Sequence, residues 1–220
     1  INVEGNNRTR DEVIRREFRQ FESAWYDSDR IRLSRDRVDR LGFFTNVAID
    51  TQAVPGSPDQ VDLTVAVAEK PTGNLTLGAG YGQAEGLSLV AGIRQENVFG
   101  SGNYLGVDVN TSKYRRTMVL STTDPYFTDT GISRTYDLYY RTDRPYYDDA
   151  AYKIVTSGGS VRFGVPFSEI DTVYFGGGVE RSEIKPGTYL PQAYKDYADK
   201  YGYSNTGIPL TLGWSRDSRD

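Results

Sequence analysis

The chain has 220 residues and a formal net charge of −4, from 26 Lys and Arg against 30 Asp and Glu, and it contains neither Cys nor His. This charge provides no basic field for a phosphate backbone, so nucleic acid is not an expected partner. The missing Cys and His exclude thiolate catalysis, zinc–thiolate sites and the commonest general base. We therefore expect no metal, no cofactor and no enzyme activity.

The mean hydropathy of −0.57 is typical of a soluble protein. No apolar run reaches the roughly 18 residues of a membrane-spanning helix. A transmembrane strand, however, needs only about 9 to 11 residues, of which every second one is apolar, so a β-barrel is not excluded. No secretory signal precedes the strand-like residues 1–5, and we expect the true N-terminus to lie upstream.

The composition changes near Glu69–Thr72. Before this point the sequence is charged and permits helices, whereas beyond it Gly, Tyr, Thr and Ser dominate. We expect two domains, residues 1–70 and residues 74–220.

Two helices are predicted in the first domain. Thr9–Glu12 fits a capping box, after which apolar residues recur at helical spacing and predict one buried stripe. These residues are Ile14, Phe18, Phe21 and Trp25. Ser28 or Asp29 can cap a second helix, for which Gly42 supplies a left-handed terminator.

The hydrophobic period then changes to two in residues 43–49 and 61–67, which flank a turn at Pro55–Pro58. With the opening strand, the order is strand, helix, helix, strand, strand. This order predicts a small α+β module in which two helices cover one face of a short sheet.

Beyond residue 74, about eight stretches alternate apolar with small, polar or charged residues. Such alternation fits either a soluble sandwich with its apolar face inside or part of an antiparallel transmembrane β-barrel with its apolar face outside. Compact turns at residues 100–102, 130–131 and 168–169 alternate with long segments at residues 143–153 and 183–205, which favours the barrel. We expect a short surface helix in the second long segment.

Aromatic residues also favour the barrel. Many of the 17 Tyr, including Tyr146 and Tyr147, lie near strand ends, as in the aromatic girdles of membrane interfaces. The apolar residues expected to point away from the concave face of the sheet include Leu75, Leu77, Leu89 and Val107.

Several motifs follow one another along the chain. They are Glu4–Thr9, Arg40–Phe44, Val54–Asp62, Glu69–Gly73, Gly78–Gly82, Gln95–Gly102 and Asp124–Phe127. In this order they resemble the BamA family of outer-membrane β-barrel assembly proteins, from its last polypeptide-transport-associated (POTRA) domain into its barrel. The resemblance implies a barrel of about sixteen strands, of which this chain supplies about half and continues past residue 220. It also implies an outer-membrane location with the N-terminal module in the periplasm.

The resemblance implies a working part that does no covalent chemistry. In the family, the first barrel strand pairs weakly with the last and can receive an incoming strand by β-augmentation. The residues of this strand are Asn74, Leu75, Thr76, Leu77, Gly78, Ala79, Gly80, Tyr81 and Gly82. Its glycines either reduce side-chain obstruction or only fit a tight barrel wall, and the sequence leaves both explanations open.

Two further candidate sites each have a simpler explanation. Arg15, Arg19 and Glu22 are expected on one exposed face of the first helix, and the resemblance places Arg15 and Glu22 where the family contacts its lipoprotein partner BamD. A solvated charged face is the alternative. The candidate periplasmic-edge motif consists of Asp124, Pro125, Tyr126 and Phe127, which also fit a plain strand end.

The expected function is the insertion of unfolded barrel clients into the outer membrane, together with assembly lipoproteins, by strand templating and local perturbation of the lipid bilayer. A passive pore or a two-partner secretion transporter is the alternative, since both carry similar modules and barrels. A weak seam would mark the insertase, and steady ion conductance would mark the pore.

Overall fold

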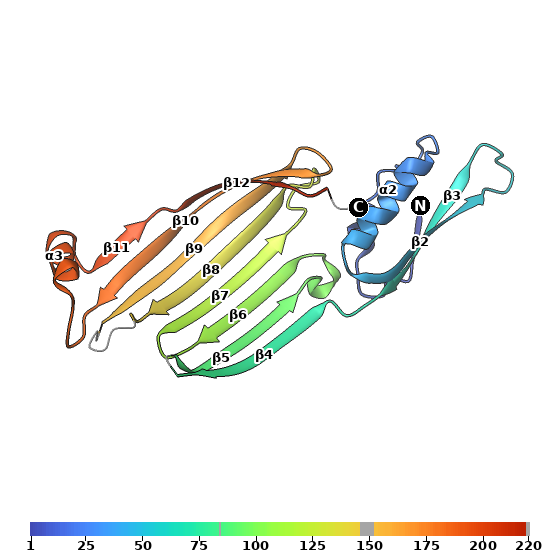
Figure 1. The fold of residues 1–220 in the computed structure, drawn as a ribbon. Helices are drawn as coiled ribbons and strands as arrows, with labels where there is room; N and C mark the ends of the chain where they lie inside the picture. Colours follow the sequence, from blue (N-terminus) through green and yellow to red (C-terminus); the bar gives the residue numbers. More distant parts are fainter. Residues whose placement is uncertain (84, 146–151, 219–220) are drawn as a thin grey trace. The chain divides into compact units, whose positions relative to one another are not determined.

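The computed structural model describes residues 1–83, 85–145 and 152–218 and forms two compact units (Figure 1). The first unit comprises Ile1–Gly73 together with Gln95–Asn103. The second comprises Asn74–Arg94 and Tyr104–Asp220.

The first unit is the expected α+β module. Its elements are β1 (Asn2–Glu4), α1 (Asp11–Arg15), α2 (Ser28–Arg40), β2 (Phe44–Ala53), β3 (Val61–Glu69) and the 3₁₀ turn η1 (Val98–Gly100). The sheet order is β1-β3-β2, with β1 parallel and β2 antiparallel to β3. Helix and strand residues share one core, formed by Val13, Ile14, Phe18, Val38, Phe43, Phe44, Val65 and Val67. The predicted strand–helix–helix–strand–strand order is confirmed.

The first helix is shorter than its apolar spacing predicts. It ends at Arg15, and its N-cap residue Arg10 makes no side-chain cap, so the capping box does not form. The hydroxyl of Thr9 instead accepts a hydrogen bond from Asn97. The predicted stripe continues into the core only as far as Phe18, because Trp25 is 94% exposed.

A tertiary contact explains the early end of α1. The Ser34 hydroxyl on α2 accepts hydrogen bonds from the backbone N–H groups of Arg19 (2.8 Å) and Gln20 (3.3 Å). The buried Gln20 side chain then donates to the Trp25 carbonyl (2.9 Å) and accepts from the Asp27 amide (3.1 Å). These bonds hold residues 19–27 as an ordered loop rather than a helix.

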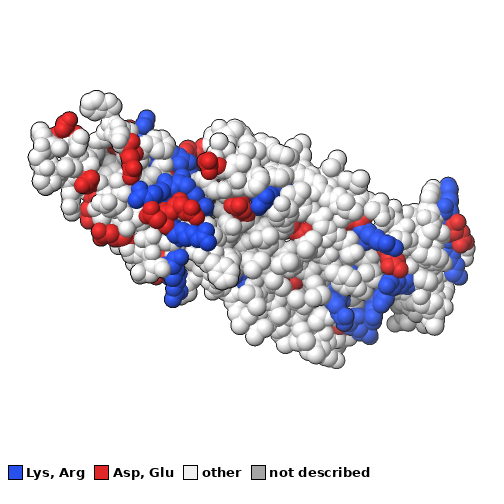
Figure 2. Space-filling view, turned by 180° about the vertical axis from the view of Figure 1, so that it is seen from behind, with Lys and Arg blue, Asp and Glu red and all other residues white. Residues whose placement is uncertain are grey.

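Helix α2 begins one or two residues earlier than the predicted caps Ser28 and Asp29 imply. Its cap is Asp27, whose side chain accepts from the amides of Asp29 and Arg30. Gly42 follows the helix with a φ of +74°, as the predicted terminator requires. Figure 2 shows Lys and Arg interleaved with Asp and Glu over the face of this unit that is in view.

The second unit is one antiparallel sheet with a short helix. Its elements are β4 (Gly73–Gly82), β5 (Gly86–Gln95), β6 (Tyr104–Thr111), β7 (Arg115–Asp124), β8 (Ser133–Asp143), β9 (Lys153–Pro166), β10 (Asp171–Lys185), α3 (Gln192–Tyr201), β11 (Ser204–Gly207) and β12 (Leu210–Arg216). From β4 to β10, each strand lies beside the next strand of the chain. The expected surface helix is α3.

The last edge of the sheet is interrupted. Strand β11 pairs with Glu180–Glu183, and β12 pairs with Asp171–Gly177, so both occupy the same side of β10. Pro209 lies between them, and its carbonyl accepts from the Gly178 amide at 3.0 Å. Counted together, β11 and β12 form the eighth strand, which confirms the eight predicted stretches.

The two faces of the sheet differ as expected for a partial membrane barrel. Leu75 and Leu77 are 67% and 73% exposed, and Leu89 and Val107 are exposed as well, so none of them lies in a dry core. Polar pairs cross the strands on the sheet's other face, such as Tyr139 Oη to Glu180 Oε2 at 2.7 Å. Within the described part of the chain, no helix is long and apolar enough to cross a membrane.

The predicted alternation of short and long connections is wrong for the first four strands. The connections after β4 and β6 are residues 83–85 and 112–114, shorter than the turns at residues 96–103 and 125–132 at the opposite end of the strands. Those turns are longer because they contain ordered structure, including η1. Tyr146 and Tyr147 lie outside the described residues.

Candidate strand-receiving edge and its anchor

Strand β4 forms one edge of the sheet. All ten of its residues, Gly73–Gly82, are exposed, and β5 is its neighbour in the strand order of the described residues. An edge strand offers backbone N–H and C=O groups to another strand. The sequence-predicted strand, residues 74–82, is thus placed where β-augmentation is chemically possible.

Gly78 and Gly80 of β4 differ in the room that they leave for a side chain. A Cβ built at Gly78 would lie 3.8 Å from the Val90 Cβ, which is ordinary van der Waals contact. One built at Gly80 would lie 3.0 Å from the Ser88 hydroxyl, which donates to the Gly80 carbonyl at 3.2 Å. At Gly78, a tight wall is therefore not the reason for glycine.

The start of β4 is held by a short connector. Lys70 donates its amide to the Phe43 carbonyl at 3.0 Å. The Thr72 hydroxyl accepts from the Gln95 side-chain amide at 2.7 Å, and the Thr72 carbonyl accepts from the Glu96 amide at 3.1 Å. These bonds fix the backbone on both sides of Pro71, directly before Gly73 begins the strand.

A carboxylate at the end of β3 anchors the loop before α1. Glu69 accepts hydrogen bonds from the backbone amides of Arg8 (3.0 and 3.1 Å) and Thr9 (2.6 Å). Partial burial raises the pKa of the Glu69 carboxyl, but the amide donors around Thr9 and Arg8 outweigh burial and leave the pKa below its ordinary value. The carboxylate therefore stays charged while it holds the loop.

The turn between β5 and β6 packs into the same unit. Asn97 is buried, and it donates to the Thr9 hydroxyl at 2.8 Å while accepting from the Gly102 amide at 2.7 Å. The Arg10 amide donates to the Gly100 carbonyl at 2.9 Å. Gly100 has a φ of +72°, and a Cβ there would overlap the Arg8 carbonyl, so this close approach requires glycine.

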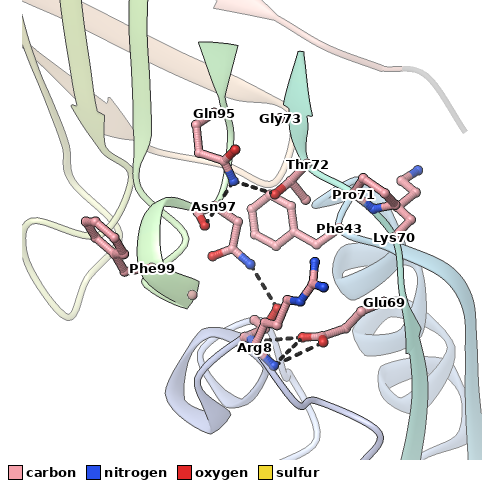
Figure 3. A pocket seen from close by; sticks show the side chains of 12 residues that line it. Arg8, Phe43, Glu69, Lys70, Pro71, Thr72, Gly73, Gln95, Asn97 and Phe99 are labelled. Atoms are coloured by element: carbon pink, nitrogen blue, oxygen red, sulfur yellow. Dashed lines mark hydrogen bonds between the residues drawn. The ribbon is translucent and has the colours of Figure 1, made fainter. Parts of the chain in front are cut away.

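These segments enclose a cavity of about 580 Å³ (Figure 3). Its lining includes Arg8, Phe43, Glu69 and Gly73. In Figure 3 the Arg8 guanidinium points into the cavity. Phe99, also at its border, is 92% exposed and has a φ of +50°, which is uncommon for an aromatic residue. Sequence analysis missed this cavity, because its lining comes from four segments that carry no shared local signal.

The predicted lipoprotein-contact residues do not lie on one helical face. Only Arg15 is in α1, while Arg19 and Glu22 belong to the irregular segment that follows. Arg15 nevertheless reaches Glu22, with Nη1 to Oε1 at 3.0 Å, and also pairs with Asp11. The hydrogen bond that Arg15 donates to the Asp11 carboxylate is the largest influence on Arg15 and raises its pKa above the ordinary value.

The Asp124–Phe127 motif ends β7 and begins a turn. The Asp124 carboxylate accepts from the Tyr126 amide at 3.1 Å, and the Phe127 amide donates to the Ile132 carbonyl at 2.9 Å. The Arg134 guanidinium lies 3.9 Å from the centre of the Phe127 ring. Each of these contacts is made within the turn or to the strand that follows it.

The chain combines an α+β module with an antiparallel sheet that exposes its apolar face. This combination defines a class of proteins, the outer-membrane β-barrels with an N-terminal soluble module. The POTRA family model, described as a surface antigen variable number repeat, matches residues 1–70. The Omp85 superfamily domain model matches residues 97–220. The chain therefore belongs to the Omp85 superfamily, whose members are outer-membrane proteins.

Within this superfamily, curated relatives of the chain include BamA proteins. The chain is 39% identical over its whole length to the outer membrane protein assembly factor BamA of Neisseria meningitidis serogroup B, and 35% identical over 83% of its length to that of Nitratidesulfovibrio vulgaris. It spans only 29% and 22% of those two proteins. The resemblance to the BamA family is confirmed.

Solved structures show the same relationship. BamA from Haemophilus ducreyi lacking POTRA domains 1–3 matches with a TM-score of 0.80 and 31% identity, over 100% of this chain and 44% of that one. CdiB from Escherichia coli matches with a TM-score of 0.54 over 98% of this chain and 41% of that one. Its 14% identity to this chain shows a shared fold alone.

Proposed function

We propose that this chain is the last periplasmic module and the first eight strands of a protein that assembles and inserts β-barrel proteins into the bacterial outer membrane. Residues 1–70 form the module, and residues 74–220 form the N-terminal part of the barrel. Unfolded outer-membrane proteins are the clients. Strand β4 receives their strands at a lateral seam, where the barrel also perturbs the bilayer locally.

The observation that carries this proposal is the position of β4 at the edge of the sheet. In the sheet formed by the described residues it is an edge strand, with glycine at a position where packing leaves room for a side chain. Exposed edges are normally blocked by charges, proline or covering loops, because they pair with other chains. Residues 74–82 contain no charged residue and no proline, which suits a strand that has to accept a partner.

Replacing Gly80 with Pro tests this proposal in the full-length parent protein. Proline removes the N–H group and restricts φ to about −65°, so strand addition should fail although every lipid-facing residue remains. The matched control is Leu77→Ile, which keeps the apolar volume and the whole backbone and should retain most activity. Insertion of a small barrel client into liposomes measures both.

Folding of both variants is checked by heat-modifiable gel mobility before the assay. A folded Gly80→Pro protein that inserts its client at the normal rate would show that residues 74–82 are not the templating strand. Their glycines would then have only a structural role.

For the module, we propose contact with a BamD-like assembly lipoprotein through Arg15, Arg19 and Glu22. Arg15 and Glu22 form one exposed ion pair, so a charge change at either residue disturbs both. Glu22→Lys should weaken binding in a pull-down at moderate salt and leave circular dichroism unchanged. Glu12→Lys, the same change at another exposed position of the module, is the control. Unaltered binding of the Glu22 variant would reject this contact.

A further inference from the structure

Arg134 lies on the apolar face of the sheet, near one end of β8. It is the second residue of this strand, and alternate residues of a strand share a face. Arg134 therefore shares its face with Tyr136 and Leu138, which are both exposed. Asp137 lies on the opposite, polar face, where it accepts from the Ser121 hydroxyl. A cation among apolar residues that face lipid is costly, so its position calls for a physical reason.

Two aromatic rings hold the Arg134 side chain. Its guanidinium carbon lies 3.9 Å from the centre of the Phe127 ring and 5.1 Å from the centre of the Tyr136 ring. A cation within about 6 Å of a ring centre is attracted by the ring. A planar guanidinium can stack on a ring and still offer N–H donors at its edge. These contacts therefore hold the guanidinium without using its N–H groups.

The N–H groups of the Arg134 side chain have no acceptor. Within residues 1–83, 85–145 and 152–218 the guanidinium forms no hydrogen bond and no ion pair, and its Nε is buried. Asp124 is opposite Arg134 in the β7–β8 register, and its carboxylate accepts from the Tyr126 amide at 3.1 Å. An unpaired cation in apolar surroundings favours an anion that comes from outside the chain.

Aromatic side chains gather at this end of the apolar face. The rings of Phe127 and Phe163 lie 6.0 Å apart. Trp214 is exposed, and its indole N–H donates to the Asp171 carboxylate at 3.2 Å. An aromatic residue with an apolar ring and a polar partner is typical of the headgroup level of a membrane. Arg134 is therefore at the depth where the phosphate groups of phospholipids lie.

We propose that Arg134 binds the phosphate of a phospholipid headgroup, while the acyl chains of that lipid lie along Tyr136 and Leu138. The guanidinium offers paired N–H donors to two phosphate oxygens. Phe127 supplies the ring that holds the guanidinium, which gives the Asp124–Phe127 turn a role at the membrane. All of these residues belong to the second unit. The inference rests on the membrane setting of the proposed function, but it requires no strand on β4.

The test uses the full-length parent protein in micelles of a neutral detergent, with two added lipids that have the same acyl chains. One lipid is phosphatidylglycerol, and the other is diacylglycerol, which lacks the phosphate. Native mass spectrometry measures the affinity for the first lipid retained. Phosphatidylglycerol should bind about tenfold more tightly than diacylglycerol, as one charge-assisted contact provides.

Two variants locate the difference. Arg134→Gln should lower the affinity for phosphatidylglycerol about tenfold and leave the affinity for diacylglycerol unchanged. Arg94→Gln is the matched control, because Arg94 lies on the polar face and pairs with Asp108 at 3.2 Å. This control should bind both lipids as the unaltered protein does. Heat-modifiable gel mobility confirms that each variant is folded.

Three results would overturn the proposal. The first is equal affinity of the unaltered protein for both lipids, a comparison for which no variant has to fold. The second is an Arg134→Gln variant that binds phosphatidylglycerol as tightly as the unaltered protein. The third is displacement of the lipid by a molar excess of inorganic phosphate, which would assign Arg134 to a free anion.

The Gly80→Pro variant separates this inference from strand reception by β4. It should bind phosphatidylglycerol as tightly as the unaltered protein, even when it no longer inserts a client. Loss of the lipid from this variant would place the lipid at β4 and overturn the site at Arg134. Retention of neither lipid by the unaltered protein would contradict the membrane setting itself, whereas equal retention contradicts only the phosphate site.

Discussion

Glycine has different neighbours in the first strand of the sheet and in its later strands. A Cβ at Gly78 in β4 would meet only the Val90 side chain, at 3.8 Å. In β9, a Cβ at Gly158 would lie 2.6 Å from the Tyr139 hydroxyl and 2.8 Å from the Val179 carbonyl. In β10, one at Gly178 would overlap the Gly159 carbonyl.

The difference shows that the same residue type serves two purposes in one sheet. Around β9, glycine lets the Tyr139 side chain cross to Glu180, with its hydroxyl 2.7 Å from the carboxylate, and this contact fixes three strands in register. At Gly78 in β4, packing does not require glycine, which agrees with the proposed open edge. The space around Gly78 therefore distinguishes it from Gly158 and Gly178, where a side chain would meet its neighbours.

The largest expected effect comes from one substitution made in both regions. Gly178→Ala in the full-length parent should destabilise the barrel by about 3 kcal/mol, because the new methyl group meets backbone that cannot rotate away. Gly78→Ala should change stability by no more than about 0.5 kcal/mol. Urea unfolding in micelles, followed by heat-modifiable mobility, measures both. Equal losses would remove the distinction between the two regions.

A smaller effect is expected at the cross-strand contact. Tyr139→Phe keeps the ring over Gly158 but removes the hydrogen bond to Glu180, which should cost about 1 kcal/mol. Tyr140→Phe, on the exposed apolar face, is the control and should be neutral. A double-mutant cycle with Glu180→Gln isolates the pairwise free energy. A coupling near zero would mean that packing over glycine, rather than the hydrogen bond, fixes the register.

The smallest effect concerns the anchor before β4. The pKa of Glu69 is lower in the folded module than its ordinary value of 4.5. The contribution of the Glu69 carboxylate to stability is therefore present above pH 4.5 and is lost as the pH falls through the lowered pKa. Protection factors of the Arg8 and Thr9 amides should fall over that range. In Glu69→Gln they should be lower at neutral pH and nearly independent of pH. Identical pH profiles in both proteins would show that Glu69 does not hold these amides.

Periodicity predicted the sheet well, because the alternation within each strand indicates by itself which of its residues lie on the apolar face. The alternation of Leu75 and Leu77 with Thr76 and Gly78 is local, and the same pattern defines the other seven stretches. The end of α1 could not be predicted in this way, because it depends on Ser34, which lies 15 residues from Arg19 in the chain. The spacing of Phe21 and Trp25 favours a helix. This helix does not form, because tertiary hydrogen bonds hold the segment as a loop.

The candidate edge was predictable, but its anchor was not. Residues 74–82 were identified from their alternation and from family motifs. Glu69 is 60 residues from Thr9, and Asn97 is 88 residues from it, so no local pattern indicated that they meet. The available signal was the Gly100–Gly102 turn, which was expected to be compact, although its packing partner was not evident from the sequence.

The neighbour order of the sheet also has a kinetic consequence. From β4 to β10, every strand pairs with the strand that precedes or follows it in the chain, so closing each hairpin costs little loop entropy. Pairing can therefore proceed in the order in which the polypeptide arrives at the membrane, without waiting for distant segments. Within the described sheet, β5 is the one neighbour of β4, so the second edge of β4 takes no part in this sequential pairing.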